Sequence, residues 1–408
     1  MLSLDKIYQA SFILKKVLHS TELVYAPKLV PGCELYIKPE NLQVTGSFKV
    51  RGAYYKMSQL TEEEKAAGVI ACSAGNHAQG VALAAKANGI HATICIPAGA
   101  PISKVEATKS YGAEVVLVKG VYDDAYARAV EIQKETGKTF IHPYDDEDVI
   151  AGQGTIGLEI LEDKTLAGSG NFADVDAVVV PIGGGGLISG VAFAVKSLNP
   201  NVKVYGVQAA GAPSMYNSMK EHQQLTLPSV STFADGIAVK HPGDITYQMC
   251  EKYVDEIVTV TDDEIATAIL AMIEQHKMVA EGAGAVSVAA CMFNKIDVKG
   301  KKVVCVVSGG NIDVTILSRV ISRGLLMEGR LLDVTIALAD KPGELTHVSD
   351  IVASTGANIV TVRHSRSDID MDINSCFLTL QMETRNKAHA DEVCAKLEEA
   401  GYQIVSSH

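Results

Sequence analysis

Short runs of apolar, β-branched residues alternate with longer stretches of helical spacing between about Gly68 and Arg330. The runs contain almost no polar positions, which is the pattern of strands buried on both faces of a sheet. They lie at 68–73, 91–97, 113–119, 175–181, 202–208 and 301–308. Helices are expected between them, including one over 77–89 that ends at the C-cap Gly89. These elements predict an α/β fold with parallel sheets and crossover helices.

A different pattern follows a linker that we expect at 321–330. Apolar residues then alternate with smaller or polar ones, at Leu332, Val334, Ile336 and Leu338. The next stretch predicts a helix that ends at Gly356, with one apolar face made of Leu345, Val348, Ile351 and Val352. Strands at 357–365 and 374–383, a second helix and a strand at 402–405 complete the order βαββαβ. This order is the ferredoxin-like arrangement, so a separate small domain is predicted.

Composition narrows the kind of protein without changing this fold. A chain of 408 residues suggests two or three compact units. Its net charge of -12 argues against nucleic acid and anionic membranes as partners. We find no apolar run of the roughly 18 residues needed to cross a bilayer and no signal-peptide layout, so a cytosolic location is expected.

Cysteine usage points to reduced thiols. The eight cysteines are scattered through apolar segments and form no CxxC pair. We therefore expect mostly buried thiols, with neither disulfides nor a thiolate metal site, and no bound metal is predicted.

Lys49 lies among small and apolar residues in the segment ENLQVTGSFKVRGA, residues 40–53. Burial there would lower the lysine pKa, because a low-dielectric environment disfavours the ammonium form. A neutral amine is what condensation with a carbonyl requires. The alternative is that Lys49 lies in solvent, as most lysines do. The three motifs that follow favour the chemical role.

Four consecutive glycines, Gly183 to Gly186, stand between a predicted strand and a predicted helix. Backbone without side chains can fold closely around an anion, and its N–H groups and the helix N-terminus favour a phosphate. A dinucleotide site is a poorer match, because Ile188 and Ser189 fall where GxGxxG needs its third glycine. The P-loop lysine is also missing. The glycines could alternatively form only a tight turn.

The segment SAGNHAQG, residues 73–80, again joins a strand to a helix. Ser73, Asn76 and nearby N–H groups could hold a carboxylate at the helix N-terminus. The alternative is ordinary helix capping by serine or asparagine. His77 is expected to be structural and not a base, because no acid accompanies it in the sequence.

Ser308 follows a buried strand in VVSGGN, residues 306–311. A serine hydroxyl can donate a hydrogen bond to a heteroaromatic nitrogen without protonating it. A neutral ring is a weaker electron sink than a pyridinium, so elimination of a leaving group is expected to outrun transamination.

With these motifs, the chain resembles the threonine dehydratases of the fold-type II pyridoxal phosphate family over essentially its whole length. SFKVRGA, SAGNHAQG, GGGGL and SGGN occur in family order, joined by IHPYDD, GQGTIGLEI, TFADGIAV and EGAGAV. The resemblance implies that Lys49 is the Schiff-base lysine and catalytic base, that Asn76 contacts the cofactor's phenolic oxygen, and that Ser308 faces its pyridine nitrogen. It further implies that Phe48 stacks on the ring. The phosphate would be held by Gly183, Gly184, Gly185, Gly186 and Leu187.

The resemblance also implies the substrate and the reaction. The loop that binds the substrate would comprise Ser73, Ala74, Gly75, Asn76 and His77. The expected reaction converts L-threonine to 2-oxobutanoate and ammonia, in isoleucine biosynthesis or threonine catabolism, with L-serine as a second substrate. A catalytic domain at 1–328 is implied, with two parallel-sheet subdomains like those of tryptophan synthase beta, the smaller inserted at about 53–150.

Three related families differ at the motif residues. Serine racemases carry a serine at the position of Ala74, which could deliver a proton to the opposite face of the substrate. Liver-type serine dehydratases carry a cysteine at the position of Ser308. Cysteine synthases have a different asparagine loop. The dehydratases therefore match best.

The segment 331–408 resembles an ACT regulatory domain, in which ADKPGEL followed by ANI matches the amino-acid-binding loop. The implied effector site comprises Asp340, Gly343, Glu344, Leu345 and Asn358. Isoleucine is the favoured effector, with valine, serine and threonine as alternatives, although the domain could serve only dimerisation. A homodimer or homotetramer is expected. The rival hypothesis is a catalytically silent amino-acid sensor.

Overall fold

The structure is a computed structural model that describes residues 2–166, 174–366 and 374–407. The chain divides into two compact units, Met1–Asp313 and Val314–His408, which are described separately. Among the described residues, we find no helix of the length and apolar character needed to span a membrane.

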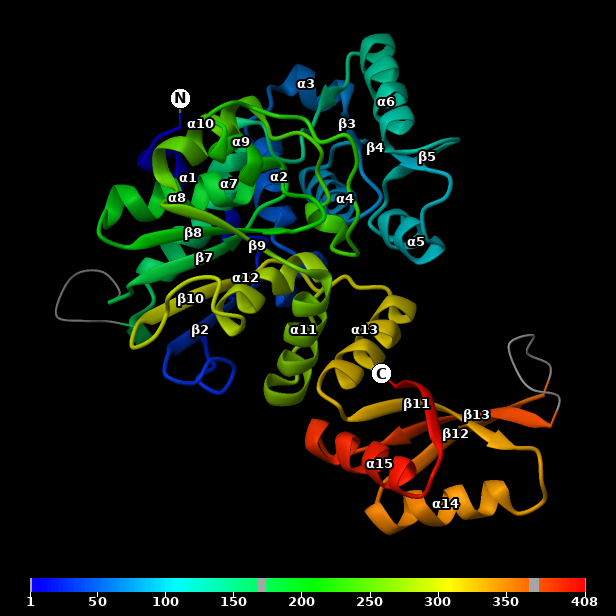
Figure 1. Cartoon of the computed structure of the whole chain (residues 1–408). Coiled ribbons are helices and arrows are strands. Elements are labelled where there is room, and N and C mark those ends of the chain that lie inside the picture. Colours follow the sequence, from blue (N-terminus) through cyan, green and yellow to red (C-terminus); the bar gives the residue numbers. More distant parts are fainter. Residues whose placement is uncertain (1, 167–173, 367–373, 408) are drawn as a thin grey trace. The chain divides into compact units, whose positions relative to one another are not determined.

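The larger sheet of the first unit has six strands (Figure 1). Its order is β1 (Val24–Tyr25), β2 (Glu34–Pro39), β10 (Lys302–Val307), β7 (Ala177–Pro181), β8 (Lys203–Ala209) and β9 (Glu256–Val260). All neighbours are parallel except β1 and β2. Cys305 of β10 pairs with both Ile37 and Val179, which places β10 in the interior of the sheet. The predicted parallel α/β fold is confirmed.

A second, four-stranded parallel sheet has the order β5 (Glu114–Val118), β4 (Ala92–Pro97), β3 (Val69–Cys72) and β6 (Thr139–Phe140). All six predicted strands of this unit exist, and five are largely buried. The prediction of a buried strand at 113–119 was wrong in its burial. That strand, β5, lies at the sheet edge, where Leu117 is 54% exposed.

Helices connect these strands and cover the sheets. They are α1 (Leu4–Leu14), α2 (Lys49–Ser58), α3 (Glu62–Ala67), α4 (Asn76–Asn88), α5 (Ile102–Ser110), α6 (Tyr122–Thr136), α7 (Glu147–Leu161), α8 (Gly186–Leu198), α9 (Ser214–Lys220), α10 (Asp244–Tyr253), α11 (Asp262–His276) and α12 (Gly282–Met292). Short 3-10 turns occur at η1 (Glu40–Leu42), η2 (Val44–Gly46), η3 (Lys164–Leu166) and η4 (Asp235–Ile237). As predicted, α4 ends at Gly89, which adopts a left-handed conformation with φ of 68°.

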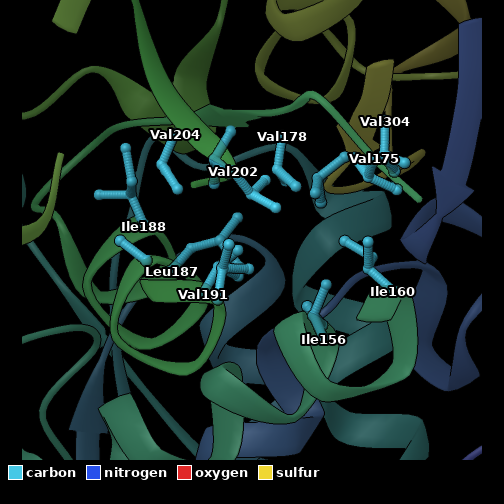
Figure 2. Packing of buried hydrophobic residues seen from close by; sticks show 14 of the residues in the cluster. Ile156, Ile160, Val175, Val178, Leu187, Ile188, Val191, Val202, Val204 and Val304 are labelled. Atoms are coloured by element: carbon cyan, nitrogen blue, oxygen red, sulfur yellow. The ribbon is translucent and has the colours of Figure 1, made fainter. Parts of the chain in front are cut away.

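The core of the first unit lies between the six-stranded sheet and helices α7 and α8 (Figure 2). Ile156 from α7 and Ile188 from α8 pack with Val178 and Val204 of the sheet, and all four are fully buried. Burying a side chain of this size contributes roughly 1.5–3 kcal/mol. The same packing fixes the start of α8, which follows the glycine run.

A buried ion-pair network supports the helix that begins at Lys49. The guanidinium of Arg51 is fully buried and donates to Glu40 Oε2 at 2.7 Å. It also pairs with Glu159 of α7, which accepts from Lys38 Nζ at 2.6 Å. Two cations and two carboxylates balance, which offsets the cost of removing them from water. The network joins α2 to β2 and α7.

The second unit carries an antiparallel sheet of order β12 (Asn358–Ser365), β13 (Ser375–Glu383), β11 (Leu331–Ala339) and β14 (Gln403–Ser407). Its helices are α14 (Glu344–Thr355) and α15 (Lys387–Glu399), which confirms the order βαββαβ. The predicted alternation on β11 is also confirmed, since Val334 and Ile336 are buried. Leu345 was wrongly placed on the buried face of its helix, because it lies in the first turn and is 45% exposed.

The linker expected at 321–330 is also wrong. Helix α13 covers Val314–Met327, within the second unit. Its buried residues Val320 and Gly324 lie four positions apart, on one face. The glycine of this segment is thus a small residue on a packed helix face and not a flexible joint.

Candidate functional site

Lys49 is the first residue of α2, and its Nζ donates to the carbonyl of Pro143 at 2.8 Å. The same Nζ lies 5.2 Å from the centre of the Phe48 ring. Burial lowers the pKa of Lys49 to about 8, against the opposing effect of the Glu281 charge. A much larger share of this amine is therefore neutral near pH 7 than for a lysine in solvent, as the sequence predicted.

The loop after β10 places Ser308 beside the segment that carries Lys49. The Phe48 N–H donates to the Ser308 carbonyl at 3.1 Å, and Ser47 forms an isolated bridge with Gly309. The Ser308 side chain is buried, and its Oγ donates to the carbonyl of Ala283 at 3.3 Å. This contact is long for an O–H donor, so the hydroxyl can turn to a better acceptor at little cost.

The glycine run joins β7 to α8, with Gly185 in the left-handed region at φ of 101°. An added Cβ on Gly184 would lie 2.4 Å from the Tyr144 ring, and one on Gly185 would lie 2.7 Å from Thr246. Thr246 Oγ1 also donates to the Gly184 carbonyl at 2.6 Å. Glycine is therefore required at both positions by packing. The first N–H groups of α8, which helices leave unpaired, begin at this loop.

The side chain of Asn76 makes tertiary contacts and does not cap its helix. The N-cap of α4 is Gly75, which receives no side-chain hydrogen bond. Asn76 Nδ2 donates to Glu281 Oε1 at 2.6 Å, and its Oδ1 accepts from Asn311 Nδ2 at 2.8 Å. Ser73 Oγ accepts from the Gly75 N–H at 3.1 Å. Helix capping therefore does not account for Asn76, whereas Ser73 bonds to the backbone at the helix start.

His77 is buried, and its Nε2–H donates to the carbonyl of Ile141 at 2.8 Å. Burial lowers the pKa of His77 to about 3, with the charge of Lys49 as the second cause. The imidazole therefore stays neutral. This geometry agrees with the structural role predicted for His77.

One cavity of about 870 Å³ brings together all the residues that the sequence predicted for catalysis, cofactor and substrate. Its lining includes Phe48, Lys49, Ser73, Ala74, Gly75, Asn76, His77, Gly183, Gly184, Gly185, Gly186, Leu187 and Ser308. Segments separated by up to several hundred positions meet there because both sheets direct their strand-end loops to the same space.

Other residues of this cavity had no predicted role. They include Glu281, Asn311, and the pair Lys104 and Asp235, whose Nζ and Oδ2 lie 3.1 Å apart. A sequence signal existed for Glu281, because an acidic residue preceding a run of small apolar residues is unusual unless it is paired or functional. The partnership with Asn76 could not be deduced from spacing.

A smaller cavity of about 400 Å³ lies in the second unit. Four of the five predicted effector residues line it, namely Asp340, Gly343, Glu344 and Leu345. Asn358 is not part of the lining, and its Nδ2 donates instead to Glu383 Oε2 on β13 at 3.0 Å. The sequence did not indicate Arg366, which lines the cavity and pairs with Asp340 at 2.9 Å.

Three residues beside this smaller cavity could in principle hold a metal. Among the described residues, Asp340, His364 and Cys376 place possible ligand atoms within 4.8 Å of one another. Arg366 already neutralises Asp340. Burial and the Asp340 charge raise the pKa of the Cys376 thiol, which disfavours the thiolate that a metal would require.

Comparisons with known proteins agree with this geometry. The family model described as "Pyridoxal-phosphate dependent enzyme" matches residues 14–309. The L-threonine ammonia-lyase of Thermotoga maritima is 51% identical over 406 residues, covering 99% of each chain. The processed threonine deaminase isoform 2 of Solanum lycopersicum superposes with a TM-score of 0.72 at 39% identity, covering 79% of this chain and 89% of that one. Maize serine racemase superposes with a TM-score of 0.73 at 35% identity, covering 79% of this chain and 98% of that one.

Proposed function

Because the chain belongs to the pyridoxal-phosphate dependent enzymes, we propose that it is a threonine ammonia-lyase that converts L-threonine to 2-oxobutanoate and ammonia. The observation that carries the proposal is one cavity lined by a buried amine of lowered pKa, a glycine loop at a helix start and a serine hydroxyl at a strand end. The name of the Thermotoga maritima relative supports the choice of threonine.

The residues of the cavity fit pyridoxal phosphate. The glycine loop leaves its backbone uncovered at the start of α8, which suits the phosphate. Lys49 Nζ donates to the Pro143 carbonyl, which a neutral amine can leave. The Ser308 hydroxyl makes a long contact with the Ala283 carbonyl, and it can donate instead to the ring nitrogen. We assign Phe48 to the ring face and Leu187 to the phosphate end.

When bound, the cofactor supplies an aldehyde that condenses with amines and a ring that withdraws electrons from the adjoining carbon. Lys49 provides the amine that holds the cofactor, and the same Nζ, freed by the substrate, is the base for the Cα proton. Ser73, Gly75 and the start of α4 hold the substrate carboxylate without a cationic side chain. Neutral Ser308 limits electron withdrawal, which favours loss of the β-hydroxyl over transamination.

Ala74 separates this proposal from racemisation. A racemase needs an acid on the substrate face opposite its lysine, and the methyl group of Ala74 has no proton to give. The likeness to maize serine racemase therefore supports the shared fold, while Ala74 favours elimination. L-Serine is proposed as a slower second substrate, because losing one methyl contact changes binding by only about 1–3 kcal/mol.

We propose that the second unit binds an amino-acid effector, with isoleucine favoured because it is the end product of the pathway that threonine dehydratases begin. Arg366 and the start of α14 suit the effector carboxylate, and Asp340 and Glu344 suit its ammonium group. Leu345 and Leu378 supply apolar lining for an aliphatic side chain. A homodimer or homotetramer is the proposed assembly, which light scattering on the intact chain would measure.

The deciding experiment measures 2-oxo acid formed by the purified enzyme with bound cofactor from threonine and from serine, with and without isoleucine. We expect turnover of both, with threonine preferred and isoleucine inhibitory. Bound cofactor without product from either amino acid would reject the lyase and favour the sensor hypothesis.

A further inference from the structure

Glu281 is an acidic residue of the cavity for which the proposed reaction has no use. It precedes α12, and its backbone is tied to the loop after β10 by a 3.0 Å bond from its N–H to the Gly309 carbonyl. Its carboxylate Oε1 accepts from Asn76 Nδ2 at 2.6 Å. Glu281 is half-buried, and it lines the cavity. The carboxyl group is therefore available to whatever occupies that space.

The protein leaves room for this carboxyl group from two sides. An added Cβ on Gly309 would lie 2.5 Å from Glu281 Oε1, and one on Gly236 would lie 3.3 Å from it. Two different loops thus present only hydrogen atoms toward the carboxylate. A position enclosed by two separate segments is not the result of a side chain lying loosely at a surface.

Asn311 and Glu281 together fix the direction of the Asn76 amide. Asn311 Nδ2 donates to Asn76 Oδ1 at 2.8 Å and to the Thr45 carbonyl at 2.6 Å. With its oxygen committed to Asn311, Asn76 must present its NH₂ group to Glu281. One of the two Nδ2 hydrogens is used there, and the second remains for an acceptor in the cavity. Asn311 and Glu281 thereby together determine which group Asn76 offers.

The charge of this carboxyl group is not neutralised by a direct ion pair. Among the described residues, none pairs with it as a salt bridge within 4.0 Å. The charged groups that face it are Lys49 of α2 and Lys104 of α5, which attract, and Asp235 of η4, which repels. Burial is the largest effect and raises its pKa to about 7. The group therefore changes charge within the neutral range.

We propose that Glu281 is a positioning residue for the dehydration. It holds the Asn76 amide toward the cofactor, and its own ionisation sets the charge beside that amide. The proposal rests on the proposed function for its effect on turnover. Its effect on the cofactor is independent of the substrate. The ionised form holds Asn76 through a charge-assisted hydrogen bond, which is the stronger kind. Protonation weakens that bond and removes the negative charge.

The test compares Glu281→Gln, which can still accept from Asn76 but carries no charge, with Glu256→Gln, which removes a charge at the exposed start of β9. The visible spectrum of each holoenzyme is recorded without substrate from about pH 5.5 to 9. We expect a spectral transition near neutrality in the wild type and in Glu256→Gln, and its loss in Glu281→Gln. A transition unchanged in Glu281→Gln would overturn the proposal.

Steady-state kinetics on threonine provide the second measurement. Glu281→Gln is expected to lower kcat about tenfold or more and to lose the fall of kcat below neutral pH, with KM nearly unchanged. A merely structural role would alter cofactor affinity or melting temperature and leave the pH profile intact, which would count against the proposal. If Glu281→Gln does not fold, Glu281→Asp keeps the charge and must keep the spectral transition. A wild type that shows the transition without turnover would refute only the lyase function.

Discussion

The Nζ of Lys49 and the carbonyl oxygen of Pro143 lie 2.8 Å apart, although 94 positions separate the two residues in the chain. A carbonyl can hold an ammonium group or a neutral amine, but it gives the cation no opposite charge. This single neutral partner, together with burial, keeps the amine easy to deprotonate.

Replacing Lys49 with alanine should abolish the covalent attachment of the cofactor and lower product formation by about 10⁴-fold or more, because both the attachment point and the base are lost. Absorption spectra and a 2-oxo acid assay would measure this. Lys65→Ala, on the exposed helix α3, is the control and should retain both signals. Borohydride reduces a Schiff base and should remove the visible band of the control. A visible band in Lys49→Ala that survives dialysis and is removed by borohydride in the same way would argue against Lys49.

Gly184→Ala should weaken cofactor binding. Its Cβ would meet the Tyr144 ring at 2.4 Å, so the loop must move, at a cost of about 1–3 kcal/mol or roughly 5- to 150-fold in affinity. Titration of the apoenzyme with pyridoxal phosphate would measure the change. Gly99→Ala, where an added Cβ meets nothing within 4 Å, should bind as the wild type does. Equal affinities would contradict the packing requirement.

Arg51→Met should lower the free energy of unfolding by about 3–5 kcal/mol, because it leaves Glu40 and Glu159 without their shared cation. Urea unfolding at neutral pH would measure it. Arg128→Met, whose ion pairs lie on the surface, should leave the free energy of unfolding nearly unchanged. Similar losses in the two variants would show that the buried network adds little.

The same network predicts an acid limit. The cations Arg51 and Lys38 lower the pKa of Glu159 to about 2, although burial opposes them. A carboxyl group with a lowered pKa contributes stability above its ordinary value near 4.5, and the contribution is lost as the pH falls from there toward 2. The urea midpoint of the wild type should therefore fall in that range, and Arg51→Met should show less of this dependence.

Ala74→Ser should introduce a measurable racemase activity, because a hydroxyl in this loop can deliver a proton to the face opposite Lys49. Chiral chromatography of serine incubated with the holoenzyme would detect D-serine. Ala74→Gly adds no proton donor and is the matched control. If neither variant forms D-serine while elimination continues, the acid of a racemase must require more than this hydroxyl.

Asp340→Asn and Arg366→Ala should each weaken isoleucine binding to the full-length protein by about tenfold or more. Each substitution removes a charged side chain that is proposed to pair with the ammonium or carboxylate group of the effector. Isothermal titration calorimetry with isoleucine, valine, serine and threonine would measure this. Asn358→Ala is the informative control, because Asn358 lies outside the cavity and bonds to Glu383. Weaker binding in Asn358→Ala alone would favour the original sequence assignment. If none of the four amino acids binds to the wild type, the effector-binding role of the second unit is rejected.

Every residue that the sequence indicated for catalysis, cofactor and substrate lines the large cavity. Asn76 and Ser308 each follow a predicted buried strand, and parallel strands bring their carboxyl ends to one edge, whereas Lys49 was indicated by its apolar surroundings and by the family resemblance. Local pattern could not predict the partners. The bonds from Asn76 to Glu281 and Asn311 join residues more than 200 positions apart, and only the tertiary structure brings them together.

The errors have physical causes of the same kind. Strand β5 has the apolar run of an interior strand but lies at a sheet edge, and strand order is not encoded in local hydropathy. Most of the segment expected as a linker belongs to helix α13, and the change of pattern after it did not reveal that Val320 and Gly324 are buried on one helix face. The role of Asn358 in the effector site stays a prediction, since its Nδ2 donates to Glu383 on the paired strand and only a binding measurement can test it.

The large cavity receives Asn76 from the helix that follows β3 of the four-stranded sheet, and Ser308 from the end of β10 of the six-stranded sheet. A molecule that contacts both residues is held by loops of both sheets, so its binding free energy also stabilises their association. The cofactor is therefore expected to stabilise the fold as well as to take part in the reaction. A chain that loses the cofactor should unfold more easily, and it should lose its activity as well.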